Sequence, residues 1–365
     1  MGRKSREPKI AIISRESNEK TLDVSMLEQE LRQRGVRVKV LSKLLTKEKS
    51  AVNALGYIGQ VIRQEAEILN SDVVVLDTYC IPASMFPRRQ GTKIVQIWHA
   101  LGAIKKFGWQ TVGKPDGSSE RTANLMRMHK GYDYVVCPSD ATAEYYCEAF
   151  RIGRDRIVKL GLPRIDYIRS VTHGDEAARA AERVRKSYPK LAGAKKIVLY
   201  APTFRRGSMP DVKGLADALD PERYTLLVKL HPLYSNGGRV FRDNIIYDED
   251  FSTYELIAAA DAVVSDYSSL VIEATLSDKP LYLYIYDADE YEKRTGLNMV
   301  FSDEAIGKYA FQDAKELAKA LEEPYDFDAL REFGRKYIDV RGAWDEDVCT
   351  KELADFIVGL SDNKK

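Results

Sequence analysis

The sequence predicts an α/β protein with two doubly wound, Rossmann-like domains that face a central cleft. Short, almost continuously apolar segments alternate with longer segments in which apolar residues recur at helical spacing. Strands that are apolar along their whole length are typical of parallel sheets covered by helices on both faces. The alternation stops and restarts near the middle of the 365 residues, a length sufficient for two domains.

The first half of the chain contains five expected strands with helical segments between them. The first such segment carries Leu22, Met26, Leu27 and Leu31 at helical spacing. We place the N-terminal domain at 1–168. The expected strands are 10–14, 36–41, 73–77, 94–98 and 134–137.

The second half opens with a charged, alanine-rich segment, 172–190, which we expect to be a helix. The C-terminal domain is expected at 169–340, and a last helix within 341–365 is expected to pack back on the N-terminal domain. The expected strands of the C-terminal domain are 197–200, 225–230, 262–265 and 280–285.

Composition and charge argue against several classes of function. The chain has 56 Lys and Arg against 55 Asp and Glu, whereas nucleic-acid binders usually carry a basic excess. No apolar segment approaches the roughly 20 residues of a membrane-spanning helix, and the basic start leads into a strand rather than a signal peptide. The four cysteines lack metal-ligand spacing, and no acidic cluster follows a strand. We therefore expect a cytoplasmic protein that needs no metal or cofactor and binds no nucleic acid.

His99 is the first candidate for chemistry. It directly follows the expected strand 94–98, and ligands of open α/β sheets bind beyond the carboxyl ends of the strands. An imidazole can accept a proton near neutral pH, so His99 is a candidate general base. The position alone is equally compatible with a half-buried histidine that packs against Trp98.

Two further groups of polar residues follow strands of the second domain. Thr203 and Arg205 come after 197–200, and a hydroxyl with a forked guanidinium suits a phosphate. Lys229 and His231 share one face at the end of 225–230, which predicts an anion between them. A solvated turn is the alternative for the first group.

The segment 260–284 is the most specific. After strand 262–265, Ser268 and Ser269 open a helix whose first N–H groups can bind an anion such as a diphosphate. Glu273 lies one turn beyond Ser269 on the same helix face and could accept hydrogen bonds from a ribose. Simple helix capping is the alternative for the serines.

The segment 88–130 departs from the neutral balance of the chain. It holds nine Lys and Arg against two Asp and Glu, with Phe107 and Trp109 among them. Basic residues beside large aromatic residues suit an anionic membrane surface. A solvated loop with inward-packed aromatic residues is the alternative.

Five motifs in chain order carry a resemblance to a known family: WHALGAIKKFG, GLPRID, APTFR, KLHP and SDYSSLVIEATLSDKP. Over residues 94–287 the chain resembles the CDP-glycerol glycerophosphotransferases, which are teichoic-acid primases and polymerases with a GT-B fold of two Rossmann-like domains. Its length is closer to that of the short primases.

The resemblance implies an enzyme without a metal or cofactor that transfers a polyol phosphate and releases CMP. The implied donor is CDP-glycerol or CDP-ribitol. The implied acceptor is an undecaprenyl-diphosphate-linked glycan at the inner face of the cell membrane, so the protein would be peripheral there. The first domain would serve the acceptor and the second the CDP donor.

The resemblance also implies roles for individual residues. His99 matches the family's base, and His231, the second residue that we expect to be catalytic, matches a histidine near the donor's diphosphate. Ser268 and Ser269 match the serines that bind the diphosphate, and Glu273 stands where the family usually has an Asp that binds the ribose. From the residues themselves we also expect the following side chains to take part: Thr203, Arg205 and Lys229 at the donor, and Lys105, Lys106, Trp109 and Arg164 on the acceptor or membrane side. The chain departs from the family at two places. Ala100 and Leu101 stand where the family's WHGTPLK has Gly and Thr, and the stretch around Arg294 and Gly296 matches only loosely.

Three other functions remain open from the residues alone. A GT-B glycosyltransferase that uses a nucleotide-sugar donor would show the same diphosphate and ribose contacts. A sugar-nucleotide 2-epimerase would share the two-domain scaffold but would need no acceptor. A nucleotide-sensing module would bind a donor without consuming it.

Overall fold

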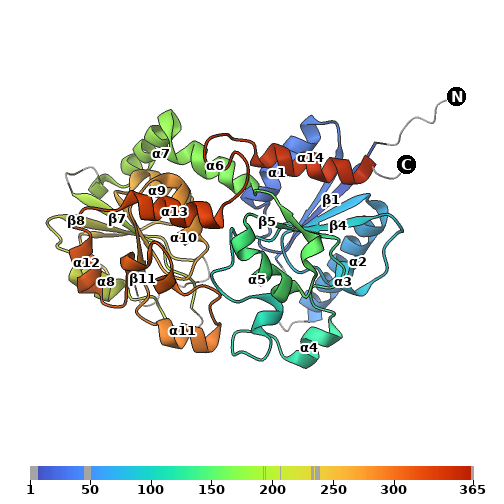
Figure 1. Ribbon diagram of the computed structural model, residues 1–365, viewed down its shortest axis with the longest axis horizontal. Coiled ribbons are helices and arrows are strands. Elements are labelled where there is room, and N and C mark those ends of the chain that lie inside the picture. Colours follow the sequence, from blue (N-terminus) through green and yellow to red (C-terminus); the bar gives the residue numbers. More distant parts are fainter. Residues whose placement is uncertain are drawn as a thin grey trace. The chain divides into compact units, whose positions relative to one another are not determined.

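The computed structural model describes residues 7–44, 51–191, 193, 195–205, 207–231, 234 and 239–362, without the side chains of 51–55 and 362. The chain divides into two compact units (Figure 1). Unit 1 consists of residues 1–166 and 338–365, and unit 2 consists of residues 167–337. The helix α6 (Pro163–Thr172) runs from one unit into the other.

Unit 1 is built on a sheet of six parallel strands in the order β2-β1-β3-β4-β5-β6. The central strand β1 pairs on both sides, so that Ile10 lies opposite Val38 on β2 and Val73 on β3. All four residues of β3 are buried, as a strand covered on both faces requires. The strands are β1 (Lys9–Ser14), β2 (Arg37–Ser42), β3 (Val73–Leu76), β4 (Lys93–Gln96), β5 (Tyr134–Cys137) and β6 (Ile157–Lys159).

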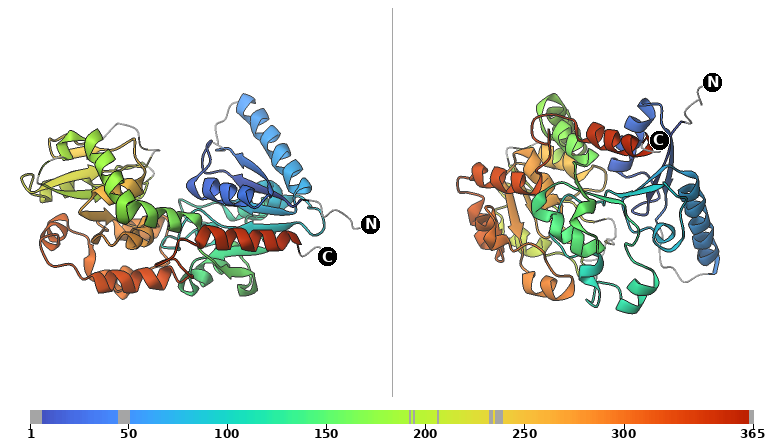
Figure 2. Two further views of the ribbon diagram at one scale, coloured as in Figure 1. Left: turned by 90° about the horizontal axis from the view of Figure 1, so that it is seen from above. Right: turned by 45° about the vertical axis from the view of Figure 1, so that its right-hand side comes forward.

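Helices cover both faces of this sheet (Figures 1 and 2). The last helix, α14, packs against α1 and against β3 and β4. Its first turn is held by the buried Asp166, whose carboxylate accepts the N–H groups of Cys349 and Thr350 at 3.1 and 2.8 Å. The helices are α1 (Leu22–Gln33), α2 (Ala51–Asn70), α3 (Ile81–Met85), α4 (Glu120–Leu125), α5 (Asp140–Phe150) and α14 (Cys349–Asp362), with 3-10 turns η1 (Gly108–Thr111) and η2 (Arg154–Arg156).

Unit 2 is built on a second six-stranded parallel sheet, in the order β12-β11-β10-β7-β8-β9. The strands are β7 (Lys196–Tyr200), β8 (Tyr224–Val228), β9 (Ile245–Tyr247), β10 (Ala262–Ser265), β11 (Leu281–Tyr284) and β12 (Ala310–Phe311). The helices are α7 (Gly174–Ser187), α8 (Val212–Ala218), α9 (Thr253–Ala259), α10 (Leu270–Ala274), α11 (Ala288–Arg294), α12 (Ala314–Ala320) and α13 (Phe327–Tyr337), with 3-10 turns η3 (Pro189–Leu191), η4 (Thr275–Ser277), η5 (Phe301–Asp303) and η6 (Gly307–Tyr309).

The two strand orders define where each unit is expected to bind ligands. In each sheet the chain proceeds outward in both directions from one pair of neighbouring strands, β1 and β3 in unit 1 and β7 and β10 in unit 2. Loops that leave the carboxyl ends of such a pair diverge and leave a crevice, the usual ligand site of open α/β sheets. Thr203 and Ser268 follow β7 and β10 themselves, whereas His99 follows β4 and His231 follows β8, the strands next to these pairs.

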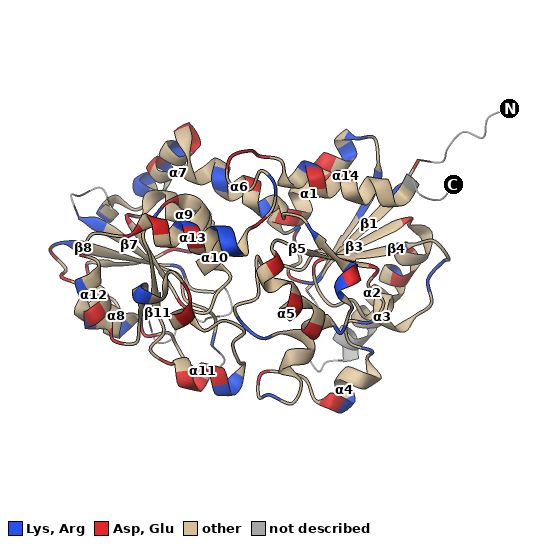
Figure 3. Cartoon of the chain, in the orientation of Figure 1, with Lys and Arg blue, Asp and Glu red and all other residues tan. Residues whose placement is uncertain are grey.

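The predicted α/β class with two parallel, doubly wound sheets is confirmed. Three strands were not expected, β6, β9 and β12, because segments of three, three and two residues are too short to show a period. Positive and negative side chains are intermingled over the helices of both units (Figure 3). Within the described ranges, no helix is both long and apolar enough to cross a membrane.

Candidate functional site

In unit 1, a strained turn presents His99. The strand β4 ends at Gln96, two residues before the expected end, because Trp98 has a φ of +57° and cannot continue a strand. The buried side chain of Gln96 fixes this turn. Its carbonyl accepts the N–H of Trp98 at 2.9 Å, and its amide donates to the backbone oxygen of Thr78 at 3.0 Å. Gln96 therefore ties the turn after β4 to the loop after β3.

The hydrogen bond of His99 selects its tautomer. The Nδ1 atom lies 3.1 Å from the backbone oxygen of Asp77, and a carbonyl oxygen can only accept. Nδ1 therefore carries the hydrogen, and Nε2 of the neutral ring is left as the proton acceptor. Glu16, which follows β1, lies 3.5 Å from the same Nδ1. His99 thus sits at the β1/β3 switch point, with contacts to the loops after both strands.

Burial keeps His99 neutral at neutral pH. Partial burial lowers its pKa below the usual value, and the positive charges of Arg164 and Lys105 act in the same direction. Burial raises the pKa of Asp77, whose carboxyl group interacts electrostatically with His99. About 35% of the His99 side chain remains exposed, so a substrate hydroxyl can reach it. An unprotonated imidazole beside a buried carboxyl group has the requirements of a general base.

In unit 2, Arg205 is the centre of a buried ion-pair network. Its guanidinium contacts Asp266, after β10, at 2.8 Å and Asp287, after β11, at 2.6 Å. Asp266 also accepts the N–H of Thr203 at 2.9 Å. The Arg205 guanidinium also donates to the backbone oxygen of Thr203 at 2.9 Å, and the expected role of Arg205 as a phosphate ligand stays a prediction. Arg205 joins the carboxyl ends of β7, β10 and β11 and shapes the switch point.

Lys229 and His231 lie beyond the end of β8, at Val228. The Lys229 ammonium donates to Asp248 at 2.6 Å and to the backbone oxygen of Phe251 at 2.7 Å. We expected an anion between Lys229 and His231. In the structure the anion next to Lys229 is the carboxylate of Asp248. His231 is exposed, and its ring lies 5.3 Å from that of Phe204. The proline of the KLHP motif lies outside the described residues.

Ser268, Ser269 and Glu273 come together as expected. The Ser269 hydroxyl donates to Glu273 at 3.4 Å, across one helical turn, and Tyr254 donates to the same carboxylate at 2.9 Å. The carboxylate is buried, so its immediate effect is to orient the Ser269 hydroxyl. Both serines are half-buried, and the Ser268 hydroxyl accepts the N–H of Leu270 at 3.3 Å.

Thr203 reaches this switch point from the neighbouring strand β7. Its hydroxyl is buried and has no hydrogen-bond partner among the described residues. A buried hydroxyl without a partner is costly, so a ligand group that hydrogen-bonds to it would be stabilised. The hydroxyls of Thr203, Ser268 and Ser269 thus follow β7 and β10, the two strands that define the switch point.

The residues expected on the acceptor side fall into two groups. Lys105 and Lys106 are half-buried in the loop after His99. Arg164 donates from its backbone and its guanidinium to the buried Asp23, at 2.8 and 2.7 Å, and so anchors the first turn of α6 to α1. The expected place of Arg164 on the acceptor side stays a prediction. Trp109 donates to the backbone oxygen of Met128 at 2.8 Å and lines a cavity described below.

Sequence reasoning missed four residues of these two centres. Gln96 and Asp77 support His99, and Asp266 and Asp287 hold Arg205. Asp77 and Asp266 directly follow buried strands, a signal that could have identified them. Gln96 and Asp287 have no such signal, because their partners are distant in sequence. In the part of the chain with described positions, no three His, Cys, Asp or Glu side chains gather as metal ligands do.

Comparisons with known proteins agree with this description. Residues 3–346 match the model of a family described as CDP-glycerol:poly(glycerophosphate) glycerophosphotransferase. A teichoic acid ribitol-phosphate primase of Bacillus spizizenii (strain W23) is 30% identical over 322 residues, which cover 85% of this chain and 80% of the primase.

Two solved structures are similar in fold. The wall teichoic acid polymerase TagF gives a TM-score of 0.68 at 19% identity, with 98% of this chain and 89% of that chain covered. A UDP-GlcNAc 2-epimerase from Neisseria meningitidis gives 0.58 at 10% identity, covering 96% of this chain and all of that one (100%). These likenesses confirm the expected GT-B-type fold, which a transferase and an epimerase share.

Proposed function

The chain belongs to the CDP-glycerol:poly(glycerophosphate) glycerophosphotransferase family, and we propose that it transfers a polyol phosphate from a CDP-linked donor to a hydroxyl of a lipid-linked glycan. The observation that best supports this proposal is the set of hydroxyls at the β7/β10 switch point, where Thr203 is buried without a partner among the described residues. Such hydroxyls suit the diphosphate of a nucleotide donor.

Unit 2 would bind the donor. The hydroxyls of Ser268, Ser269 and Thr203 donate to the diphosphate, and the exposed His231 neutralises it from the end of β8. Glu273 orients Ser269 and belongs to the ribose side of the donor. Arg205 and Lys229 act through their carboxylate partners by fixing the strand ends that carry these residues.

His99 of unit 1 would act as the base. Its Nε2 atom takes the proton of the acceptor hydroxyl, and the acceptor oxygen forms a bond to the phosphorus that carries the polyol. The bond between that phosphorus and the oxygen of CMP breaks, and CMP leaves with the electron pair. The reaction therefore depends on positioning and charge stabilisation, as phosphoryl-type transfer generally does.

The acceptor would be a glycan on undecaprenyl diphosphate at the inner face of the cell membrane. The excess of Lys and Arg in segment 88–130 supports a peripheral association there, because each basic residue near an anionic surface favours binding. The description of the family names glycerol, whereas the Bacillus spizizenii relative is a ribitol-phosphate primase. Both CDP-glycerol and CDP-ribitol are therefore candidate donors for a single, primase-like addition.

The test is CMP release from CDP-glycerol and from CDP-ribitol, each with and without a lipid-linked disaccharide acceptor, and with a UDP-sugar as a parallel donor. We expect CMP only when the acceptor is present, and the more active donor identifies the polyol. Release of UDP from the sugar with no CMP from either polyol donor would contradict the proposal. It would instead favour a nucleotide-sugar enzyme, which the shared fold permits.

A further inference from the structure

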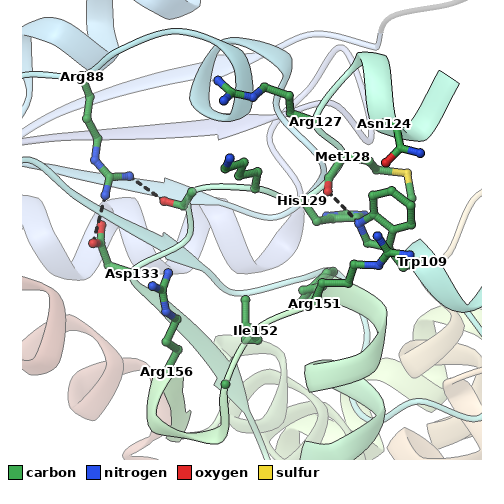
Figure 4. A pocket seen from close by; sticks show the side chains of 14 residues that line it. Arg88, Trp109, Asn124, Arg127, Met128, His129, Asp133, Arg151, Ile152 and Arg156 are labelled. Atoms are coloured by element: carbon green, nitrogen blue, oxygen red, sulfur yellow. Dashed lines mark hydrogen bonds and ion pairs between the residues drawn. The ribbon is translucent and has the colours of Figure 1, made fainter. Parts of the chain in front are cut away.

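Unit 1 contains a cavity of about 710 Å³ that the proposed reaction does not use (Figure 4). Asp133 and Arg156, in its wall, directly precede β5 and β6, so the cavity lies at the amino ends of these strands. His99 instead follows the carboxyl end of β4. His99 does not line the cavity, but the Trp98 ring lies between the two, 4.1 Å from the His99 ring and 5.9 Å from the ring of His129 in the cavity wall.

The cavity is strongly positive. Arg88 is paired with Asp133 at 3.0 Å. Within the described part of the chain, no carboxylate pairs with the other four cations of the wall. The four side chains are exposed to solvent, and their positive charges together favour an anion at the cavity. The four cations are Arg127, Lys130, Arg151 and Arg156.

The backbone of the cavity wall is strained. Arg127, His129 and Arg151 have φ values of +48°, +59° and +53°, and only two other non-glycine residues with described positions have positive φ. Gly131 has a φ of +97°, and a Cβ there would lie 3.1 Å from the backbone oxygen of Ala83. Strained residues gathered in one wall indicate a site that the fold is built to form.

One side of the cavity is aromatic and apolar. The Arg151 guanidinium lies 3.4 Å from the centroid of the Trp109 ring, and the Trp109 indole is held by Met128 (Figure 4). Two exposed apolar side chains stand next to wall residues in the sequence. Leu125, beside Asn124, is 70% exposed, and Phe86, two residues before Arg88, is 44% exposed.

We propose that this cavity binds the phosphate headgroup of a bilayer lipid, as an anchoring site separate from the reaction. The guanidinium and ammonium groups that have no carboxylate partner among the described residues bind the phosphate, and the exposed apolar side chains contact the acyl region. The inference rests on the proposed function in one respect: an enzyme whose acceptor is carried by a lipid works at a membrane. His99 is not among the residues that line the cavity, so the site is distinct from the base itself.

The test is co-sedimentation of the full chain with phosphatidylcholine vesicles that contain or lack phosphatidylglycerol. We expect binding only to the anionic vesicles, and we expect inorganic pyrophosphate to compete. The double variant Arg127→Gln/Lys130→Gln removes two exposed cations, so it should fold normally and bind at least about tenfold more weakly, given the contribution of each basic residue near a membrane.

A matched variant, Arg37→Gln/Lys39→Gln, removes the same charge from β2, at the far edge of the sheet, and should bind within about twofold of the wild type. Equal losses in both variants, or no loss in the cavity variant, would overturn the proposal. CMP release with a water-soluble acceptor separates the two proposals. With this acceptor the cavity variant should keep wild-type turnover. If the wild type releases no CMP, the proposed function is refuted. The vesicle result then decides the anchoring site by itself.

Discussion

At the scale of single residues, the chemistry depends on one ring nitrogen of His99. The backbone oxygen of Asp77 accepts from Nδ1, and this contact leaves Nε2 as the basic atom. A histidine packed for structure alone, the alternative that the sequence left open, would not need an exposed, unprotonated nitrogen at a switch point. Two predictions follow from this geometry.

Replacement of the base should separate turnover from donor binding. His99→Ala should lower kcat by about 10²–10⁴-fold, the usual contribution of a positioned base, and leave CDP affinity nearly unchanged. Calorimetry with CDP and a CMP-release assay measure the two quantities. The matched control is His173→Ala, which removes an exposed histidine of unit 2. It should leave kcat within about twofold, because His173 does not act as the base. Near-normal turnover of His99→Ala would refute the role.

The pH profile should report the lowered pKa of His99. The base is active when unprotonated, so activity falls as the pH drops through its pKa. Because burial and nearby positive charges lower that pKa, the acid limb of kcat/KM should lie below about pH 6.5, the ordinary value for histidine. Because burial lowers the pKa of His99 to about 4, rates measured from about pH 3 to about pH 8 test this prediction. An acid limb centred above pH 7 would contradict it.

At the scale of elements, two small networks hold the strand ends that carry the site. Gln96 joins the turn after β4 to the loop after β3, and Arg205 joins the ends of β7, β10 and β11. Both networks are buried, so removal of a central side chain leaves polar groups without partners. Each network therefore makes a prediction about stability as well as activity.

Gln96→Leu should lower both stability and turnover. The loss leaves the N–H of Trp98 and the oxygen of Thr78 unpaired, at a cost of about 1–3 kcal/mol in the free energy of unfolding. Because the turn presents His99, kcat should fall while CDP affinity is retained. As a control, Gln64→Leu replaces a buried amide whose Nε2 has no partner among the described residues, and it should cost less. Equal effects of the two variants on kcat would argue against a positioning role.

Arg205→Met should destabilise the protein strongly, because it leaves the buried charge of Asp266 and the half-buried charge of Asp287 without a cation. Breaking a buried pair in this way costs about 3–5 kcal/mol, whereas an exposed pair is worth about 0–1 kcal/mol. Arg223→Met, which breaks an exposed pair with Glu322, is the matched control. Urea unfolding measures both. Loss of donor affinity without loss of stability would instead indicate that Arg205 is a direct phosphate ligand.

At the scale of the whole molecule, features that depend on neighbouring residues could be predicted from the sequence. Contacts between residues far apart in the sequence could not. Periodicity was enough to predict the long buried strands, and the i, i+4 relation was enough to bring Ser269 and Glu273 together. The strand orders, which define the switch points, depend on pairing between distant segments. Arg205 and Asp287 are 82 residues apart, and Lys229 finds Asp248 on the loop after β9, so their pairing could not be predicted.

The central claim is that one polyol phosphate moves from a CDP donor to a glycan hydroxyl. The most direct measurement is the mass of the lipid-linked acceptor after incubation with the preferred CDP-polyol, together with the amount of CMP formed. The account predicts that the acceptor gains the mass of a polyol phosphate, that CMP appears in equal amount, and that both products are nearly lost in His99→Ala. A gain of a sugar mass with UDP release, or CMP formed without any change in the acceptor, would contradict it.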